Sequence, residues 1–440
     1  MHDILIKAGE FILAISILVV IHELGHFLAA RMFGIRVEKF FLFFDVAGIK
    51  LFSFTRGDTT YGMGWLPLGG YVKITGMIDE SMDKDFAKSV PQDYEFRSKP
   101  AWQRLIVMLA GIFMNVILGI VIFTFHTFHY GEDYLPAKEL NNGIVAHSLA
   151  KEAGFKTGDV IVAMNGKPLK RADDIRNTGL ILDKDVSYDV QRDGKTLHLP
   201  MPTGFGNRLV TVGLDSFIEL RQSFEVGTDI NSLAKSEGLK AGDKIVSIND
   251  TASPYFNDVT NLLAHSKNKE AKVVVLHAGM ATPETLHGQI DKDGHFGFRP
   301  KFYFESESYG LAESFKVGSD KAWHSVTDNV KGLWRLVSGD LPAKSLHSLI
   351  GIANAFPSSW DWSGFWMLTG LLSMVLAFMN LLPIPALDGG HVIFLLVEMV
   401  RRKPVSIRVL EVAQMVGMGF LFLLMGFALY NDVAQYIFKR

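Results

Sequence analysis

The chain has 440 residues, of which 48% are hydrophobic and 20% are charged, and its formal net charge is −2. This composition is typical of a membrane protein that carries hydrophilic domains, and the near-neutral charge argues against a nucleic-acid partner. Cysteine is absent, which excludes disulfides and thiolate chemistry, so any metal must bind to nitrogen and oxygen atoms.

Four apolar stretches reach the length that crosses a bilayer. They cover residues 4–30, 105–125, 365–382 and 409–430. The loop after the first stretch and the loop after the third are both rich in arginine and lysine. Because positively charged loops stay in the cytoplasm, we expect both termini and the long segment 129–364 to face the opposite side of the membrane.

The first stretch contains His22, Glu23 and His26. Residues four apart share one face of a helix, so both imidazoles can bind one ion with the glutamate beside it. This spacing is the zinc-metalloprotease pattern, in which zinc lowers the pKa of its bound water to about 7 and the glutamate takes the proton. Ionisable groups at membrane depth are costly, which favours a functional role.

Two other interpretations of this stretch are open. It could be a secretory signal peptide, with Lys7 as its basic flank and a cleavage site near Ala29 and Ala30, although the ionisable motif interrupts the part that should be most apolar. Alternatively, the motif is accidental and its two histidines bond neighbouring helices.

Residues 34–100 are expected to form more than a linker. Three runs in this segment are rich in aromatic and β-branched residues: 34–44, 49–55 and 60–74. Such runs predict a small antiparallel sheet. The part from 64 to 73 is too apolar for an exposed hairpin, so we expect it to enter the membrane or pack against the spans, with Pro67 at a sheet edge. Residues 79–91 are expected to form a polar loop.

The segment between the second and third stretches contains an internal repeat. The pattern Ser-Leu-Ala-Lys, Gly, Lys-x-Gly-Asp, Ile-Val and Asn runs from Ser148 to Asn165 and again from Ser232 to Asn249. Self-similarity at a fixed offset predicts two copies of one unit, each followed by a further helix near 172–178 or 257–265.

The repeated Gly-Asp-x-Ile-Val-x-hydrophobic-Asn pattern resembles the PDZ domain. The resemblance implies that each copy accepts an extended peptide as an added strand. A purely steric β-domain without a ligand is the alternative. Residues 306–361 then predict amphipathic helices lying along the membrane surface, with an ordinary packed linker as the alternative.

The third zinc ligand is expected near the end of the third stretch. Residues 380–391 contain two prolines and two glycines, and broken backbone at membrane depth is tolerated only where protein or a water-filled cavity satisfies it. Asp388 can supply a carboxylate oxygen and leave the fourth position for water. The first and third stretches run in the same direction, so His22, His26 and Asp388 should lie in the same leaflet.

Several other polar residues have candidate roles. Asn380 could hold the substrate, or it could bond the carbonyls freed beside the prolines. We read His391 as a neighbour of the metal ligands or an interfacial residue. Asn115 is expected to make a helix–helix contact, with a place in the pocket as the alternative. His126 and His129 should lie at the outer interface, away from the zinc.

The two motifs and the paired inserts together resemble the site-2 protease family, most of all its RseP-type members. The resemblance spans essentially the whole chain. It implies intramembrane cleavage of single-pass membrane proteins, such as anti-sigma factors already trimmed on their outer side, and of leftover signal peptides. It also implies a bacterial inner-membrane location, with the PDZ-like domains in the periplasm and the active site near the cytoplasmic leaflet.

The resemblance also assigns the site residues. It implies one Zn²⁺ per chain on His22, His26 and Asp388, with Glu23 as the base and Asn380 in contact with the substrate. An edge strand would pair with the substrate backbone through Leu68, Gly69, Gly70, Tyr71 and Val72. Two departures from the family pattern, at 43–45 and 110–112, put the shape of the re-entrant sheet in question but not the zinc chemistry.

The sequence thus predicts an α-helical polytopic membrane protein with four transmembrane helices, a small re-entrant β-sheet and two inserted α+β PDZ-like domains. The expected segments are the first transmembrane helix (1–33), the re-entrant β region (34–100), the second transmembrane helix (101–130), the PDZ-like domains (131–218 and 219–305), the amphipathic linker (306–362), the third transmembrane segment (363–391) and the cytoplasmic loop with the fourth helix (392–440).

Two other functions compete with an intramembrane protease. One is a catalytically idle membrane adaptor that uses metal for stability, although a structural metal site has no need of Glu23. The other is a membrane-anchored protease that cuts soluble peptides, although the hydrophilic domains contain no zinc motif.

Overall fold

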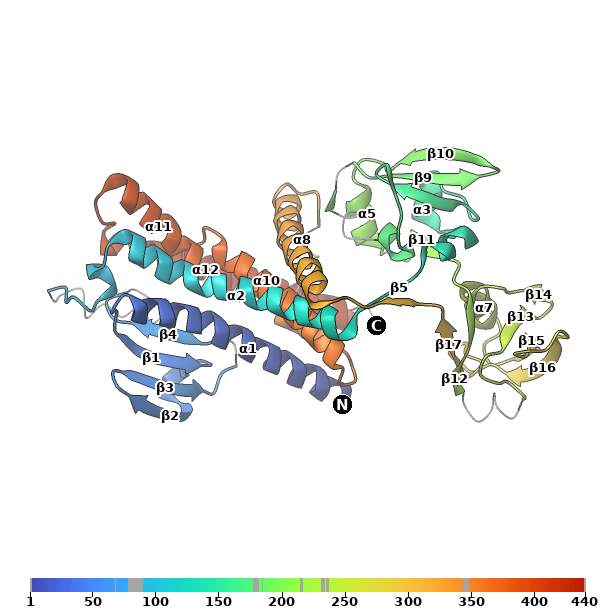
Figure 1. Cartoon of the computed structure of the whole chain (residues 1–440), viewed down its shortest axis with the longest axis horizontal. Coiled ribbons are helices and arrows are strands. Elements are labelled where there is room, and N and C mark those ends of the chain that lie inside the picture. The colour runs from blue at the N-terminus through green and yellow to red at the C-terminus, as the bar shows by residue number, and fades with distance from the viewer. Residues whose placement is uncertain are drawn as a thin grey trace. The chain divides into compact units, whose positions relative to one another are not determined.

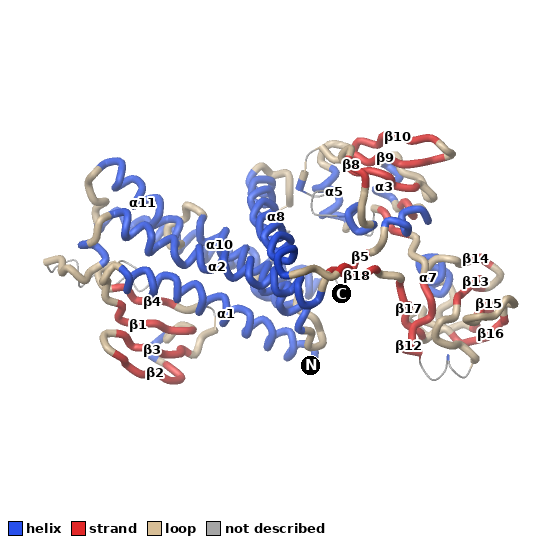
Figure 2. The backbone as a smooth tube through the Cα atoms, in the orientation of Figure 1, coloured by secondary structure: helices blue, strands red, loops and turns tan. Residues whose placement is uncertain are grey.

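The computed structural model describes residues 2–67, 69–77, 90–176, 182–183, 185–213, 217–230, 234, 237–342 and 348–438. Leu68 and most of the expected polar loop lie outside these residues. The chain divides into two compact units (Figures 1 and 2). The helical unit comprises Met1–Gly131, Ser308–Trp334 and Ala343–Arg440, and the repeat unit comprises Glu132–Glu307 and Arg335–Pro342.

Four helices in the described chain are long and apolar enough to cross a membrane. They are α1 (His2–Met32), α2 (Ala101–Tyr130), α10 (Trp362–Leu381) and α12 (Ile407–Phe438). Each coincides with one of the four apolar stretches, so the number and position of the expected apolar helices are confirmed.

Helix α2 packs against both α1 and α10. On one side, a Cβ atom added to Gly25 would lie only 2.4 Å from the carbonyl oxygen of Ala110, so the backbones of α1 and α2 touch there. On the other side, Ser373 donates a hydrogen bond of 2.7 Å to the backbone oxygen of Asn115. Residue pairs along both contacts run in opposite order, so α1 and α10 are each antiparallel to α2. The expected shared direction of α1 and α10 is therefore confirmed.

A four-stranded sheet follows α1. Its strands are β1 (Val37–Leu42), β2 (Lys50–Arg56), β3 (Thr59–Gly64) and β4 (Tyr71–Ile74), in the order β2-β3-β1-β4. The expected antiparallel arrangement is wrong in one respect, because β1 and β3 pair in parallel. A connection with a short helical turn, η1 (Val46–Gly48), separates β1 from β2 and leaves room for β3 between them.

Strand β4 is the edge strand nearest α1, as expected for the segment after Pro67 (Figure 1). A Cβ atom on Gly70 would lie 2.6 Å from both the Phe41 carbonyl oxygen and Val19 Cγ1. Only glycine permits so close an approach of the strand to α1. The sheet is thereby held against the helix one turn before the paired histidines.

Two helices follow the repeat unit. Helix α8 (Leu311–Val337) confirms the expected long amphipathic helix and crosses α2 rather than running along it (Figure 1). At the crossing, a Cβ atom on Gly318 would lie 2.6 Å from the Thr124 backbone nitrogen. Trp323 and Trp334 remain exposed on α8. The shorter α9 (Leu349–Asn354) precedes α10, and the membrane-surface position of these helices remains a prediction.

Helix α11 (Asp388–Arg401) was not expected from the sequence, which predicted a basic loop there. It packs against α2. Val392 and Leu395 join the core beside Val107 and Met108, and Glu398 pairs with Arg104 at the start of α2. Burial of one apolar face therefore stabilises a helix in a segment whose terminal charges indicate only a loop.

The repeat unit confirms the internal repeat as two similar substructures. The first has the sheet order β10-β9-β7-β8 with a separate β11-β6 pair, and the second has the matching order β16-β15-β13-β14 with a β12-β17 pair. The strands of the first repeat are β6 (Ile144–Ala146), β7 (Val160–Met164), β8 (Lys167–Pro168), β9 (Ser187–Arg192), β10 (Lys195–Pro200) and β11 (Ile218–Leu220). Those of the second are β12 (Phe224–Ile230), β13 (Lys244–Ile248), β14 (Thr251–Ala252), β15 (Glu270–Leu276), β16 (Glu284–Gln289) and β17 (Phe298–Phe302).

Short elements complete the chain. They are η3 (Phe96–Ser98), β5 (Glu132–Tyr134), η4 (Ala137–Asn142), α3 (Ser148–Glu152), η5 (Ala172–Arg176), α5 (Phe205–Val212), α7 (Phe256–Ala264) and β18 (Glu305–Glu307). The second expected helix of each repeat corresponds to η5 and α7. In the first repeat it is a 3₁₀ turn as far as the described residues extend. The PDZ identity of the repeats remains a prediction.

The residues that the two repeats share make the same local hydrogen bonds. In the Lys-x-Gly-Asp turn, the aspartate accepts a hydrogen bond from the lysine backbone, at 2.8 Å for Asp159 and 2.8 Å for Asp243. Each buried aspartate also binds a basic side chain at the end of the neighbouring strand or directly after it. In the first repeat this is Arg192, and in the second it is His277, whose other ring nitrogen contacts Glu284.

The second repeat should therefore lose stability as the pH rises. Hydrogen bonds to Asp243 and then to Glu284 raise the pKa of His277 above its ordinary value of 6.5. Folding thus favours protonated His277, so its contribution is complete below about pH 6.5 and is lost as the pH rises through the folded-state pKa. Hydrogen exchange of β13 and β15 should accelerate over this range relative to β7 and β9, where Arg192 does not titrate. His277→Arg should remove the difference, and equal pH profiles in the two repeats would contradict this account.

Candidate metal centre

His22 and His26 lie on one face of α1 and are 8% and 6% exposed. Their Nε2 atoms are 3.2 Å apart. The Oδ2 atom of Asp388 lies 3.2 Å from each of them. The three residues predicted as zinc ligands therefore converge, although Asp388 is more than 360 positions away in the chain.

This geometry fits a tetrahedral metal. Ligand atoms at about 2.0–2.1 Å from a tetrahedral zinc are about 3.3 Å from one another, close to the separations found here. Asp388 Oδ2 is buried and faces the two imidazole nitrogens without forming a hydrogen bond to any described residue. Two nitrogens and one oxygen from three side chains also match the donor set of a catalytic zinc with one open position.

Asp388 is positioned by the break between α10 and α11. A Cβ atom on Gly389 would lie 2.2 Å from the Leu382 oxygen, and one on Gly390 would lie 2.6 Å from the Ile384 oxygen, so α11 starts in direct contact with the end of α10. Ala386 has a positive φ of 87°, which is unusual for a residue with a side chain. The prolines and glycines thus turn the chain sharply enough to bring Asp388 back towards α1.

Glu23 is half-buried beside the paired histidines. The backbone of Val72, on the edge strand β4, lies close to its carboxylate. The structure thus brings the expected base, the predicted metal ligands and part of the expected substrate-binding strand to one place. Gly69 and Gly70 lie immediately before β4, and Tyr71 begins it.

Helix α2 supplies contacts to both histidines on the side away from the metal. His26 Nδ1 donates to the Val107 carbonyl oxygen at 2.8 Å. Asn115, expected to make a helix contact, has its Nδ2 atom 3.2 Å from His22 Nδ1. Between them, a Cβ atom on Gly111 would lie 2.3 Å from His26 Nε2. The roles of Val107 and Gly111 were not anticipated, although successive spacings of four residues, from Val107 to Gly111 and from Gly111 to Asn115, place all three on one helix face.

The remaining candidates are placed as follows. Asn380 is half-buried, with Nδ2 3.3 Å from His22 Nε2, so it lies on the metal side of the ring. His391 is not part of the metal-capable group of His22, His26 and Asp388. His126 bonds Ser363 at the start of α10, near the other end of α2, and is therefore remote from the site as expected.

The repeat unit contains a second metal-capable group and a cavity. Asp291, Asp293 and His295 form an exposed group in a turn. Backbone amides of this turn, first that of His295, donate hydrogen bonds to the Asp291 carboxylate and lower its pKa. These hydrogen bonds stabilise the charged carboxylate without a metal.

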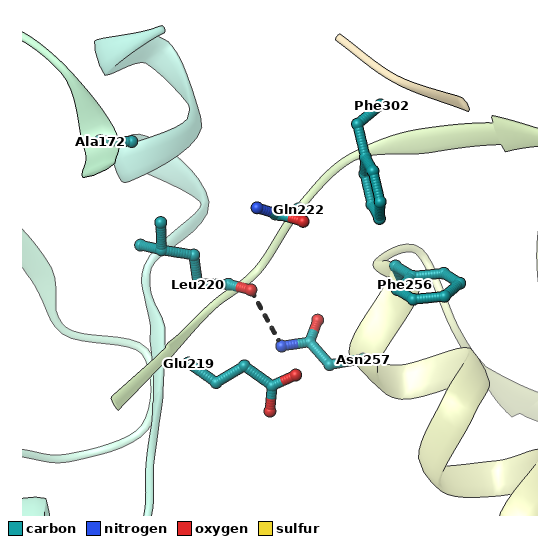
Figure 3. Close-up of a pocket in the computed structure, with 7 residues that line it drawn as sticks. All are labelled: Ala172, Glu219, Leu220, Gln222, Phe256, Asn257 and Phe302. Carbon is teal, nitrogen blue, oxygen red and sulfur yellow. Dashed lines mark hydrogen bonds between the residues drawn. The ribbon is translucent and has the colours of Figure 1, made fainter. Parts of the chain in front are cut away.

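A cavity of about 450 Å³ lies between the two repeats (Figure 3). Its lining consists of Ala172, Glu219, Leu220, Gln222, Phe256, Asn257 and Phe302.

Replacing Gly111 by alanine should reduce metal binding. The added methyl group would overlap the Nε2 atom of His26, which cannot move without leaving its metal-binding position. Gly119→Ala is a matched control on the same helix, because its new methyl group would meet the flexible side chain of Met374. Zinc per purified chain should fall for Gly111→Ala and stay unchanged for Gly119→Ala. Equal occupancy in both variants would show that Gly111 does not limit the site.

Known proteins are similar to this chain over nearly its full length. The chain matches peptidase family M50 over residues 10–424. A Vibrio cholerae protein named as a candidate zinc metalloprotease is 30% identical over 473 positions, covering 99% of this chain and 100% of that protein. Regulator of sigma-E protease RseP is 29% identical in Salmonella typhimurium and 28% in Escherichia coli, with 99% and 97% of this chain covered. This chain therefore belongs to peptidase family M50, the site-2 protease family of metalloproteases.

Proposed function

We propose that this protein is a zinc endopeptidase that cleaves single-pass membrane proteins within the bilayer. The observation that carries the proposal is the convergence of His22 and His26, on the apolar helix α1, with Asp388, at the break that follows the apolar helix α10. One Zn²⁺ per chain would be held by these three side chains. An ionisable group placed among membrane-spanning helices is usually retained for function, which supports catalysis over a chance arrangement.

The chemistry follows from the positions of the side chains. Zinc bound here would polarise a water molecule and the substrate carbonyl. Glu23, beside the ligands, takes the proton of the attacking water and passes it to the leaving amine. Asn380 lies on the metal side of His22, where its amide can hold the substrate backbone. These roles use groups that are already close to one another, so little rearrangement is needed.

Strand β4 is the proposed substrate-binding edge. A transmembrane helix shields its peptide bonds with its own hydrogen bonds, so it must unwind before water can attack. The edge strand offers new partners to the freed groups. The contact of the Val72 backbone with Glu23 supports this role, because a peptide paired to β4 would lie beside the base.

Membrane location and orientation are inferred from the sequence and the relatives. The chain is an integral membrane protein with four apolar helices. The charge pattern of its loops supports a bacterial inner-membrane orientation, with the repeat unit in the periplasm and the metal centre near the cytoplasmic leaflet. The sigma-E regulators among its relatives support anti-sigma factors as a substrate class, with remnant signal peptides as a second.

The two repeats are proposed to be PDZ-like domains that either bind a peptide or exclude bulky substrates. The cavity between them supports peptide binding, because Phe256 and Phe302 give it an apolar wall beside the α7 helix and the β17 strand (Figure 3). The amide of Asn257 donates to the Leu220 oxygen at 3.0 Å and so links the second repeat to the last strand of the first. A ligand in this cavity would therefore contact both repeats.

Replacing Glu23 by glutamine should abolish cleavage and leave zinc bound. Loss of a general base typically costs about 10²- to 10⁴-fold in rate. Co-expression with a tagged single-pass substrate measures the cleaved fraction, and elemental analysis measures zinc. Glu10→Gln is the matched control, because Glu10 is buried on the same helix but accepts a hydrogen bond from the Asp361 backbone, away from the metal.

Each outcome separates the proposed enzyme from the alternatives. Full cleavage by Glu10→Gln and none by Glu23→Gln supports the protease. Equal cleavage by wild type and Glu23→Gln would refute it. Absence of cleavage even by the wild type, with partner binding intact, would favour the idle adaptor.

A further inference from the structure

We infer that the Asn115 side chain fixes the ring tautomer of His22 that can bind the metal. In this arrangement, His22 Nδ1–H donates to Asn115 Oδ1, and Nε2 keeps a free electron pair. The inference rests on the proposed zinc centre. It makes Asn115 a positioning residue, because it touches neither the metal nor the substrate and acts through His22.

The first step is the burial of Asn115. Its exposed fraction is 0%, and it lies in the middle of α2, a helix that is otherwise strongly apolar. An amide in such a place is costly unless its polar atoms are paired. Its Nδ2 atom lies 3.2 Å from His22 Nδ1, whereas Oδ1 has no hydrogen-bond partner among the described residues. The amide is therefore in contact with His22, a proposed metal ligand, and only its nitrogen has a polar neighbour.

The second step follows from the protons on the ring. A neutral imidazole carries one N–H, and the nitrogen that binds a metal must be the other one. In His22, Nε2 faces both His26 and Asp388 at 3.2 Å, so Nε2 is the metal-binding atom. The proton must then be on Nδ1, and the group opposite Nδ1 must accept it.

The third step settles the orientation of the amide. An amide nitrogen cannot accept a hydrogen bond, but its oxygen can, and a half-turn of the side chain exchanges the two atoms without moving anything else. The half-turn still leaves one amide atom unpaired. Before the half-turn, the Asn115 Nδ2 donor faces the His22 Nδ1–H donor. After it, the Asn115 Oδ1 atom faces this N–H and can accept its hydrogen bond, so the oxygen is the atom that belongs beside His22.

His26 provides an internal comparison. Its Nδ1 atom is 2.8 Å from the Val107 carbonyl oxygen, which can only accept, so the proton of His26 is also on Nδ1. Helix α2 thus supplies an acceptor to each metal-binding ring, two helical turns apart on one face. The acceptor for His26 is backbone and insensitive to mutation, whereas the acceptor for His22 is a side chain. Asn115 is therefore the position at which this support can be removed.

The test compares three variants of the purified full-length protein. Asn115→Leu removes the acceptor with little change in size, and Asn115→Asp keeps an acceptor but cannot donate. Ser373→Ala is the packing control, because Ser373 bonds the Asn115 backbone oxygen and does not contact His22. Zinc affinity is measured by competition with a chelator, and ¹⁵N spectra of labelled histidine report the ring tautomers in metal-free protein. Thermal unfolding of the metal-free variants checks that each is folded.

Asn115→Leu should weaken zinc binding about 10- to 100-fold, as removal of a ligand's hydrogen-bond partner usually does. It should also lower the fraction of His22 protonated at Nδ1. Asn115→Asp should retain more zinc affinity than Asn115→Leu, and Ser373→Ala should match the wild type. Wild-type affinity and tautomer in Asn115→Leu would overturn the inference, as would equal losses in the Leu and Asp variants. A wild-type protein that binds no zinc would instead refute the proposed metal centre.

Discussion

The mutual approach of three electron-pair donors is the constraint on which the rest of the helical unit depends. Two imidazole nitrogens and a carboxylate oxygen lie 3.2 Å from one another among apolar helices. Such a group is unfavourable without a cation, because little water is present to screen the charge or satisfy the lone pairs. A bound metal would pair with these lone pairs and remove the unfavourable free energy of burying them. It would also link α1 to the start of α11, which lie far apart in sequence.

Close backbone packing makes this approach possible. Gly25 and Ala110 bring α1 and α2 into contact, and Gly111 leaves room for the His26 ring. Gly389 lets α11 start against the end of α10, so that Asp388 returns to α1. Small residues are typical of close helix contacts in membranes, where apolar side chains gain little by leaving lipid. Here the same contacts also set the size of the metal site, so packing and catalysis depend on the same glycines.

The sequence predicted the parts that have local periodicity or a specific spacing. The His-Glu-x-x-His pattern, the proline-glycine break before Asp388 and the four apolar stretches can each be recognised from the local sequence. The structure brings the three predicted metal ligands together. The internal repeat was equally readable, because its turn residues make the same bonds in both copies.

Other features depend on long-range contacts that no local pattern reveals. Helix α11 is stabilised by burial of Val392 and Leu395 against α2. The parallel β1–β3 pair arises because the connection through η1 leaves space for an inserted strand. Asn115 was read as a helix contact because its neighbours in sequence are apolar, and only the position of His22 identifies its partner.

X-ray absorption at the zinc edge of the purified full-length protein tests the central claim most directly. The account predicts one zinc per chain with four nitrogen or oxygen neighbours at about 2.0–2.1 Å, two of them imidazoles. In Asp388→Asn, the zinc content should fall and any remaining zinc should keep both imidazoles. Full occupancy with an unchanged spectrum in that variant, or a wild-type zinc without two imidazoles, would contradict the account.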